Sequence, residues 1–320
     1  MTPPRYNVPG QTVWVTVQAV GRSFRFVPTV QVRESIDFLF ALLATKYGLK
    51  VHEYLFMSNH FHLVATDPKG VISDFLCEFD SILSRQLNAL RGTTGTNFEG
   101  EPTIQAIADS AGIIAEAIYT LCNPLAAHLV KHMRDWKASS SFGLEYGESV
   151  TFARPKCGIW AEKRRPARKG KHPSRWRLKY RGRSKAPETA TLELVRPQAM
   201  LKLGDDALRR HIRDRVAERE QELHEERRRT KTKVVGWLGV IAQHYLAMPS
   251  TPRVLFQRRP RVAGQDRGAC AILLDTLDRF VRAYRRALEA FKAGDRSSVF
   301  PYGTLQMVRR YDVACATAPP

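Results

Sequence analysis

The first 145 residues consist of short apolar runs whose spacing switches between the period of a strand and that of a helix. Residues 11–28 are rich in valine and aromatic side chains, with partial alternation and a turn at Gly21, which predicts a hairpin or a pair of strands. Residues 33–48 carry apolar side chains at helical spacing and end at Gly48, which predicts an amphipathic helix with a glycine stop.

Two short strands are expected after this helix. They cover residues 49–57 and 60–67, and a tight turn at Ser58 and Asn59 joins them. Apolar residues then recur at helical spacing over residues 71–91. A second amphipathic helix therefore follows the pair of strands.

The remaining elements of this region are a strand over residues 103–107 and a third helix over 110–130. An interruption of this helix is expected where Asn123 precedes Pro124, because a residue before proline is disfavoured in helical geometry. The order of strand, helix, two strands, helix, strand and helix predicts an α+β fold. In it, helices pack on one face of a mostly antiparallel sheet.

The composition changes at about residue 150. Between Arg154 and Lys185, 14 of 32 residues are lysine or arginine, and three aromatic side chains are interleaved with them. Such a segment favours a nucleic-acid-binding arm, in which cations neutralise phosphates and aromatic rings stack on unpaired bases. A solvated linker is the alternative, and the two are compatible because an arm of this kind can fold on binding DNA.

Helices are the main elements expected beyond this basic segment, over residues 205–229, 234–246 and 270–295. The chain therefore divides into an α+β domain, a basic arm or linker and a mainly helical C-terminal region, over 1–150, 151–200 and 201–320.

The charge of the chain points to a polyanionic partner. Its 320 residues include 51 lysines and arginines against 31 acidic residues, for a net charge of +20. This charge favours nucleic acid over an anionic membrane and disfavours a hydrolase of small phosphates. Five scattered cysteines and an N-terminus without a signal-peptide pattern predict a reducing cytoplasm and no structural zinc. The most apolar segment is too short to cross a bilayer, so no membrane partner is expected.

Two histidines lie two residues apart on the expected strand over 60–67. Side chains alternate along a strand, so His60 and His62 share one face while Phe61 points to the other. Two imidazoles and one oxygen ligand would leave positions for water and a substrate phosphate around Mg²⁺ or Mn²⁺. A solvated polar face is the simpler alternative.

A second group lies on the third helix, where Tyr119 and Asn123 are four residues apart and share a face. Taken alone, Tyr119 has the features of a core residue with a solvated hydroxyl. Asn123, in front of a proline, has those of a helix terminator.

The two groups together resemble a known family. Residues 56–65 (FMSNHFHLVA) and 118–130 (IYTLCNPLAAHLV) are similar to the REP-associated tyrosine transposases, a branch of the single-tyrosine HUH transposases that act on single-stranded DNA. Residues 83–95 (LSRQLNALRGTTG) and 135–140 (DWKASS) extend the similarity, which covers roughly residues 10–145.

The resemblance implies a ferredoxin-like catalytic domain and a DNA transposase that cleaves and rejoins single-stranded DNA. Tyr119 would be the nucleophile, forming a 5′-phosphotyrosine link and a free 3′-OH. His60 and His62 would bind Mg²⁺ or Mn²⁺, and Asn123 stands where related enzymes have a third ligand. A metal would be needed because a phenol with a pKa near 10 is a poor nucleophile at neutral pH.

The expected partner is single-stranded or hairpin DNA, and a homodimer is left open. DNA contacts are expected from basic and aromatic side chains: Arg85, Arg91, Lys163, Arg164, Arg165, Arg168, Lys169, Lys171, Arg175, Trp176, Arg177, Lys179 and Arg181.

Some positions depart from the family pattern. Ser58 stands where proline is common, Ala126 where arginine is common and His128 where glycine is common. The loop TNFEGEP, residues 96–102, carries acids where the family has basic residues. These changes leave two rivals open: a DNA-binding regulator that no longer cuts, and a nicking enzyme of the rolling-circle type.

Overall fold

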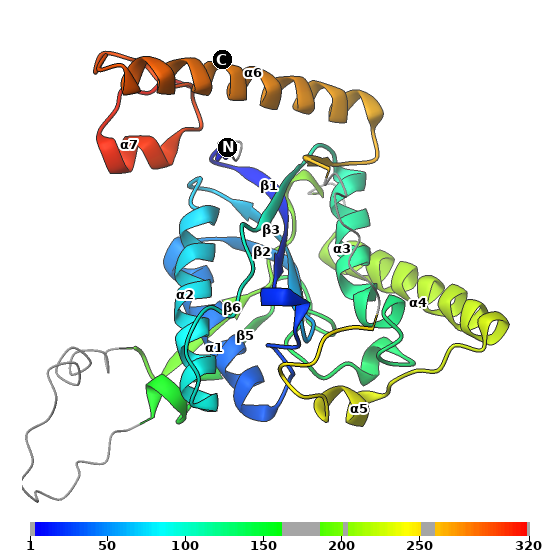
Figure 1. Ribbon diagram of the computed structural model, residues 1–320. Coiled ribbons are helices and arrows are strands. Elements are labelled where there is room, and N and C mark those ends of the chain that lie inside the picture. Colours follow the sequence, from blue (N-terminus) through cyan, green and yellow to red (C-terminus); the bar gives the residue numbers. More distant parts are fainter. Residues whose placement is uncertain (1–3, 162–185, 201–203, 251–259, 319–320) are drawn as a thin grey trace, which may run out of the picture.

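The structure is a computed structural model that describes residues 4–161, 186–200, 204–250 and 260–318 (Figure 1). Five strands form its central sheet in the order β2-β3-β1-β4-β7. They are β1 (Gln11–Gln18), β2 (Lys50–Phe56), β3 (His60–Asp67), β4 (Thr103–Ile107) and β7 (Val262–Ala263). β5 (Ser149–Ala153) and β6 (Thr189–Glu193) form a separate ribbon.

Helices surround the sheet and give the chain the mixed α+β architecture that the sequence predicts. Within the described residues they are α1 (Val30–Tyr47), α2 (Ile72–Arg91), α3 (Ser110–Ala126), α4 (Asp205–Thr230), α5 (Trp237–Ile241), α6 (Arg267–Lys292) and α7 (Leu305–Tyr311). None of these described helices combines the length and the apolar character needed to cross a bilayer.

β1 lies inside the sheet, and the predicted hairpin over 11–28 is wrong. β1 pairs antiparallel with β3 along one edge and with β4 along the other. Both edges are thus occupied by strands distant in sequence, so residues 20–28 form no second strand and instead contain a 3-10 turn over Val20–Arg22 and irregular segments. The predicted strands around Ser58 and Asn59 are confirmed as the antiparallel pair β2 and β3.

The first two helices end where the glycines predict. Gly48 follows α1 with φ of 70°, and Gly92 follows α2 with φ of 66°. A left-handed residue after the last helical turn is favourable for glycine because it has no Cβ. Local sequence therefore determines the ends of both helices.

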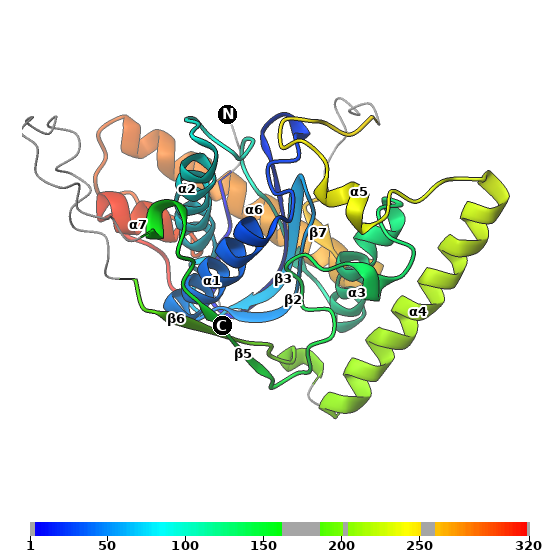
Figure 2. The ribbon, with the colours of Figure 1, turned by 90° about the horizontal axis from the view of Figure 1, so that it is seen from below.

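The sheet is covered by helices on both faces, which corrects the expectation of helices on one face (Figure 2). On one face, Phe61 of β3 packs against Phe79 of α2, with ring centroids 5.5 Å apart. On the other, Trp14 of β1 packs against Tyr119 of α3, with centroids 5.6 Å apart. Neighbouring strands bury apolar side chains on both faces, and a second helical layer is needed to cover the face that α1 and α2 leave open.

α3 continues through Pro124 to Ala126, so the predicted interruption at Asn123 is wrong. Proline removes one hydrogen-bond donor and disfavours helical geometry at the preceding residue, but both effects are preferences. Here the side chain of Asn123 is tied to β3, and Leu121 and Leu125 are buried. Tertiary packing thus outweighs the local preference against helix at Asn123, and the helix continues to Ala126.

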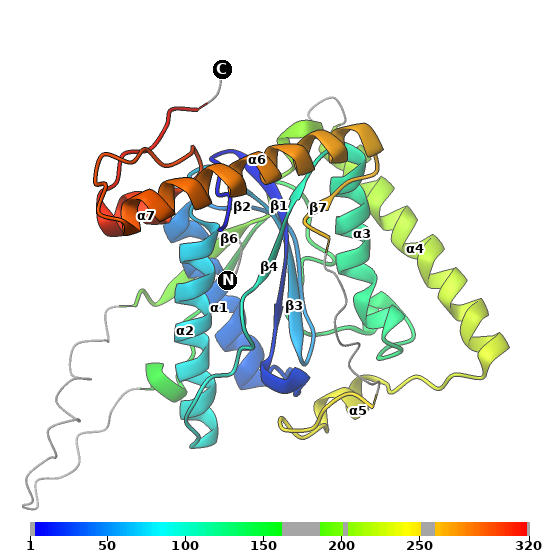
Figure 3. The same cartoon turned by 45° about the horizontal axis from the view of Figure 1, so that its top comes forward.

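The C-terminal half packs around the α+β region. The β5/β6 ribbon lies against α1, where Thr45 Oγ1 donates to the carbonyl oxygen of Thr191 at 2.9 Å. α4 packs against α3, and α6 passes over one end of the sheet (Figure 3). β7 pairs in parallel with β4, so a strand from beyond residue 260 completes the sheet.

A buried ion pair joins α4 to the sheet. Glu53 of β2 and Arg209 of α4 are at most 2% exposed at their side chains and form a direct ion pair. Ser141 and Tyr146 also donate hydrogen bonds to the Glu53 carboxylate. Arg209 donates in addition to the carbonyl oxygens of Leu144 and Ser141, at 2.6 and 2.7 Å. Both charges are thus fully bonded, which is the condition under which a buried pair is tolerated.

We expect Arg209→Met to lower the free energy of unfolding by about 3 to 5 kcal/mol, because it leaves the Glu53 carboxylate buried without a countercharge. Urea unfolding measures this change. The matched control is Arg213→Met, one turn further along α4, which removes an exposed ion pair with Glu145 and should cost less than about 1 kcal/mol. Equal losses in the two variants would refute the role given to the buried pair.

His52 of β2 is buried and neutral. Its Nε2 lies 2.8 Å from Thr66 Oγ1 and its Nδ1 lies 2.6 Å from the carbonyl oxygen of Val195. Burial lowers the pKa of His52 from its ordinary value of 6.5 to about 4. The histidine has the satisfied polar contacts of a core residue.

This shift in the His52 pKa predicts acid sensitivity. The unfolded chain takes up the proton first, so the contribution of His52 is complete above pH 6.5 and is lost as the pH falls towards 4. The loss amounts to about 3 kcal/mol. Urea unfolding of wild type and His52→Gln at several pH values checks it. The difference between them should change by that amount over the interval, and a constant difference would contradict the assignment.

Candidate active site

The candidate site lies where β1, β3 and α3 meet. His60 and His62 lie on the face of β3 that is turned towards α3, with ring centroids 4.8 Å apart, and Phe61 is fully buried on the opposite face. In the β1/β3 register, Thr16 lies opposite His62 and Gln18 opposite His60. The alternation that the sequence predicts for the histidine pair is therefore present.

Asn123 of α3 reaches both histidines. Its amide oxygen lies 3.3 Å from His60 Nε2, and its amide nitrogen lies 3.0 Å from His62 Nε2. The two Nε2 atoms and the Asn123 amide thus converge on one small region of the pocket. Two nitrogens and an amide oxygen form a donor set that suits a divalent metal.

The outer nitrogen of each imidazole has its own partner. Nδ1 of His62 lies 3.0 Å from Thr16 Oγ1, and Nδ1 of His60 lies 2.7 Å from Asn59 Oδ1. Asn59 donates its amide group to the carbonyl oxygen of Arg22, so its oxygen is the atom turned to His60. Both nitrogens of His60 thus face an amide oxygen, and a neutral ring donates to only one of them. Donation from Nδ1, across the shorter contact, leaves a lone pair on Nε2, as in histidines that bind metals.

Burial keeps both imidazoles neutral. It lowers the pKa of His60 to about 4, and the pKa of His62 lies well below 6.5 because of burial and of the neighbouring His60. A neutral imidazole is the form that binds a metal. The residues present thus fit a divalent ion in both donor type and protonation.

Tyr119 lies one turn before Asn123 on α3 and is 53% exposed. Its ring makes edge contacts with Trp14 and His62, at centroid distances of 5.6 and 5.4 Å. Partial burial raises the pKa of Tyr119 and Glu116 acts in the same direction, while a hydrogen bond with Asn123 opposes them. The phenol is therefore protonated at neutral pH, and it faces an open space.

That space is a pocket of about 540 Å³. It is lined by Trp14, Thr16, Gln18, Arg22, Asn59, His60, His62, Thr103, Gln105, Glu116, Tyr119, Asn123 and Pro260. The four residues expected to act together thus share one pocket. Sequence and structure agree on this proximity, although the residues come from segments about sixty positions apart.

Several lining residues were not anticipated from the sequence. Trp14, Thr16 and Gln18 alternate along β1, so a period of two from the expected strand indicates them once its buried face is known. Glu116 lies three residues before Tyr119 and shares its helix face. Burial raises the pKa of Glu116 to about 7. No local signal in the sequence indicates that Arg22 lines the pocket. Its backbone is left-handed, with φ of 57°.

The basic residues expected to contact DNA are not gathered at this pocket. Arg85 lies on α2 and donates to the carbonyl oxygen of Ser81. Arg91 donates to the carbonyl oxygen of Arg25 and lies over the ring of Tyr245, 4.5 Å from its centroid. Neither lines the pocket. The expected residues from Lys163 to Arg181 lie outside the described residues.

The chain matches no protein-family model and no curated protein. Among solved structures it is similar to a REP-associated tyrosine transposase bound to a REP hairpin, at 19% identity and a TM-score of 0.38. That match covers 44% of this chain and 82% of the other. A protein from Deinococcus radiodurans proposed to be a transposase is similar at 18% identity and a TM-score of 0.25, over 33% and 86%. Since these scores are low, we base the function on the pocket.

Proposed function

We propose that this chain is a metal-dependent DNA transposase that cleaves and rejoins single-stranded DNA through Tyr119. The observation that carries the proposal is the meeting of a histidine pair, an amide and a half-exposed tyrosine in one open pocket. The strand order β2-β3-β1-β4, with helices between the strands, supports the ferredoxin-like expectation for this domain. The net charge of +20 supports a polyanionic substrate.

His60, His62 and Asn123 would hold Mg²⁺ or Mn²⁺ through two Nε2 atoms and an amide oxygen. Thr16 and Asn59 orient the two imidazoles through their Nδ1 atoms. When bound, the ion polarises the scissile phosphate and offsets the negative charge that develops on it. These five side chains thus support a phosphate-activating role for the pocket.

Tyr119 supplies the nucleophile. Its phenol oxygen forms a bond to phosphorus while the bond from phosphorus to the 3′ oxygen breaks, which yields a 5′-phosphotyrosine link. The proton lost by the phenol is balanced by the proton that the leaving 3′ oxygen gains. Attack by a 3′-OH of another strand reverses the step and joins that strand, so the covalent link retains the bond energy without ATP.

The surroundings of Tyr119 fit a phosphate group. Arg22 brings positive charge to the lining of the pocket. Glu116 is the acidic residue of the lining, and its raised pKa lets it be neutral when a phosphate enters. The basic segment containing Lys163 to Arg181 is proposed to hold the flanking DNA.

We expect a covalent adduct between the protein and labelled single-stranded DNA hairpins taken from the neighbourhood of its own gene. The adduct should need Mg²⁺ or Mn²⁺ and should be lost in Tyr119→Phe, since the phenol oxygen is the bonding atom. A denaturing gel measures it. Tyr311→Phe is the control, because Tyr311 is similarly exposed, at 58%, but lies on α7.

Either of two other results would favour a rival. Tight DNA binding by wild type without an adduct under any metal would favour the regulator that no longer cuts. An adduct that is hydrolysed or rejoined only to its own strand would favour the nicking enzyme.

Metal binding should depend on the residues that orient the imidazoles. We expect Thr16→Val to weaken Mn²⁺ binding by about 10-fold to 100-fold, because it removes the partner of His62 Nδ1. Titration followed by electron paramagnetic resonance of free Mn²⁺ measures it. Thr12→Val is the matched control on the same strand, since Thr12 bonds to Thr66 instead. Equal affinities in both variants would contradict the role given to Thr16 in orienting His62 for metal binding.

A further inference from the structure

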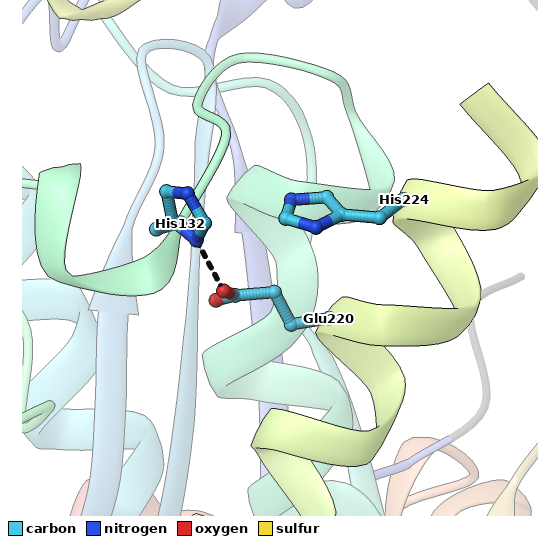
Figure 4. A group of neighbouring side chains, drawn as sticks. All are labelled: His132, Glu220 and His224. Atoms are coloured by element: carbon cyan, nitrogen blue, oxygen red, sulfur yellow. Dashed lines mark hydrogen bonds and ion pairs between the residues drawn. The ribbon is translucent and has the colours of Figure 1, made fainter. Parts of the chain in front are cut away.

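A second group of possible metal ligands lies away from the pocket, at the contact between α4 and the segment that follows α3 (Figure 4). His132 belongs to that segment, and Glu220 and His224 lie one turn apart on α4. One ligand atom from each residue lies within 4.8 Å of the other two. All three residues are partly buried, so solvent does not fully surround them.

The contacts of this cluster already resemble a ligand shell. His132 Nδ1 lies 2.5 Å from Glu220 Oε1, and the rings of His132 and His224 meet edge to face at 4.9 Å. The second carboxylate oxygen of Glu220 accepts from the backbone N–H of Met133 at 2.9 Å. The outer atoms of a metal ligand are usually bonded to the protein in this way.

The tautomer of His224 is determined by a backbone contact. Its Nε2 lies 2.7 Å from the carbonyl oxygen of Lys131, which can only accept. Nε2 of His224 therefore carries the proton, and Nδ1 carries a lone pair when the ring is neutral. His224 is thus oriented by the protein with one nitrogen available to a metal.

From this geometry we infer that His132, Glu220 and His224 form a binding site for Zn²⁺ or a similar transition metal. Two imidazoles and one carboxylate are a known ligand set for zinc. Three protein ligands leave a fourth position for water. The ion would take the place of the hydrogen bond between His132 and Glu220. The scattered cysteines led to the expectation of no structural zinc. The ligands of this site are two histidines and a glutamate, so it needs no cysteine.

The bound ion would fix α4 to the end of α3. Arg227 of α4 already donates to the carbonyl oxygens of Val130 and Lys131, at 3.3 and 3.4 Å. Glu220 and His224 lie on the same helix and contact the same segment. A metal would add a link between elements that are about ninety residues apart in sequence. The proposal does not depend on the DNA chemistry of the pocket.

Zinc binding to chelator-treated, full-length protein tests the proposal. The background is His60→Ala/His62→Ala, which removes the pocket ligands, and we expect one zinc per chain by competition with a chromophoric chelator. Adding His224→Ala or Glu220→Gln should weaken this binding by at least about 100-fold, since even outer partners of a metal are worth 10-fold to 100-fold. Adding His211→Ala or Glu225→Gln, at exposed positions on the same helix, should leave it unchanged.

Thermal unfolding tests the same site in protein that keeps His60 and His62. With the pocket intact, zinc should raise the midpoint of His211→Ala by several degrees more than that of His224→Ala, because a ligand that binds only the folded state stabilises it. Zinc should also slow hydrogen exchange in residues 126–133. Equal zinc affinity, equal thermal shifts and unchanged exchange in the two variants would overturn the site.

Discussion

The alternation of side chains along β1 and β3 is the constraint on which both the core and the pocket depend. Antiparallel pairing sets Thr16 opposite His62 and Gln18 opposite His60, while Val17 lies opposite Phe61. A slip of one residue in this register would turn both histidines into the layer under α1 and α2 and turn Phe61 towards α3 and the pocket. Burial of the valines and of Phe61 therefore positions the polar groups of the other face.

The second constraint is the position of α3, and α4 determines much of it. Arg209 fixes one end of α4 to β2 through the buried pair with Glu53. Towards its other end, Arg227 donates to backbone carbonyl oxygens at the C-terminal end of α3 and beyond it. Since α3 carries Tyr119 and Asn123, residues more than eighty positions later in the chain hold the candidate site in place. The helical C-terminal region is thus part of the architecture of the site.

Local features could be predicted from the sequence because they depend on neighbours in the chain. Gly48 and Gly92 ended their helices as expected, and 60–67 formed a strand with its histidines on one face. The candidate site was recognisable because its two motifs each lie on one such element. The spacing between the two motifs indicated the resemblance to a known family, which neither motif would indicate alone.

The features that were missed depend on distant pairing. The edges of β1 are taken by β3 and β4, so the nearer segment could not pair with it. Glu53 and Arg209 are 156 residues apart, and neither position carries a local sign that its charge is buried. Arg227 belongs to a run of charges typical of a solvated surface, yet it is buried against carbonyl oxygens.

The left-handed residue after α3 bears on one position at which the sequence departs from the transposases that it resembles. His128 has φ of 54° where the family commonly has glycine, the residue that adopts this conformation without strain. Histidine is among the side chains enriched there, so the backbone path is kept at a modest cost. The change is therefore compatible with an unaltered end of α3 and does not by itself favour a chain that no longer cuts.

The charge of the proposed donor set has a consequence for substrate binding. Two neutral imidazoles and an amide carry no negative charge, so a divalent ion held by them keeps its full charge. Glu116, whose pKa is raised to about 7, is only partly ionised at neutral pH and offsets part of it. In the proposed function, a DNA phosphate would be the main countercharge, and it would stabilise the ion as much as the ion stabilises it, because coupling between two bound ligands is reciprocal. Such a site would bind its metal most firmly when DNA is present, which would link activation of the phosphate to the arrival of the substrate.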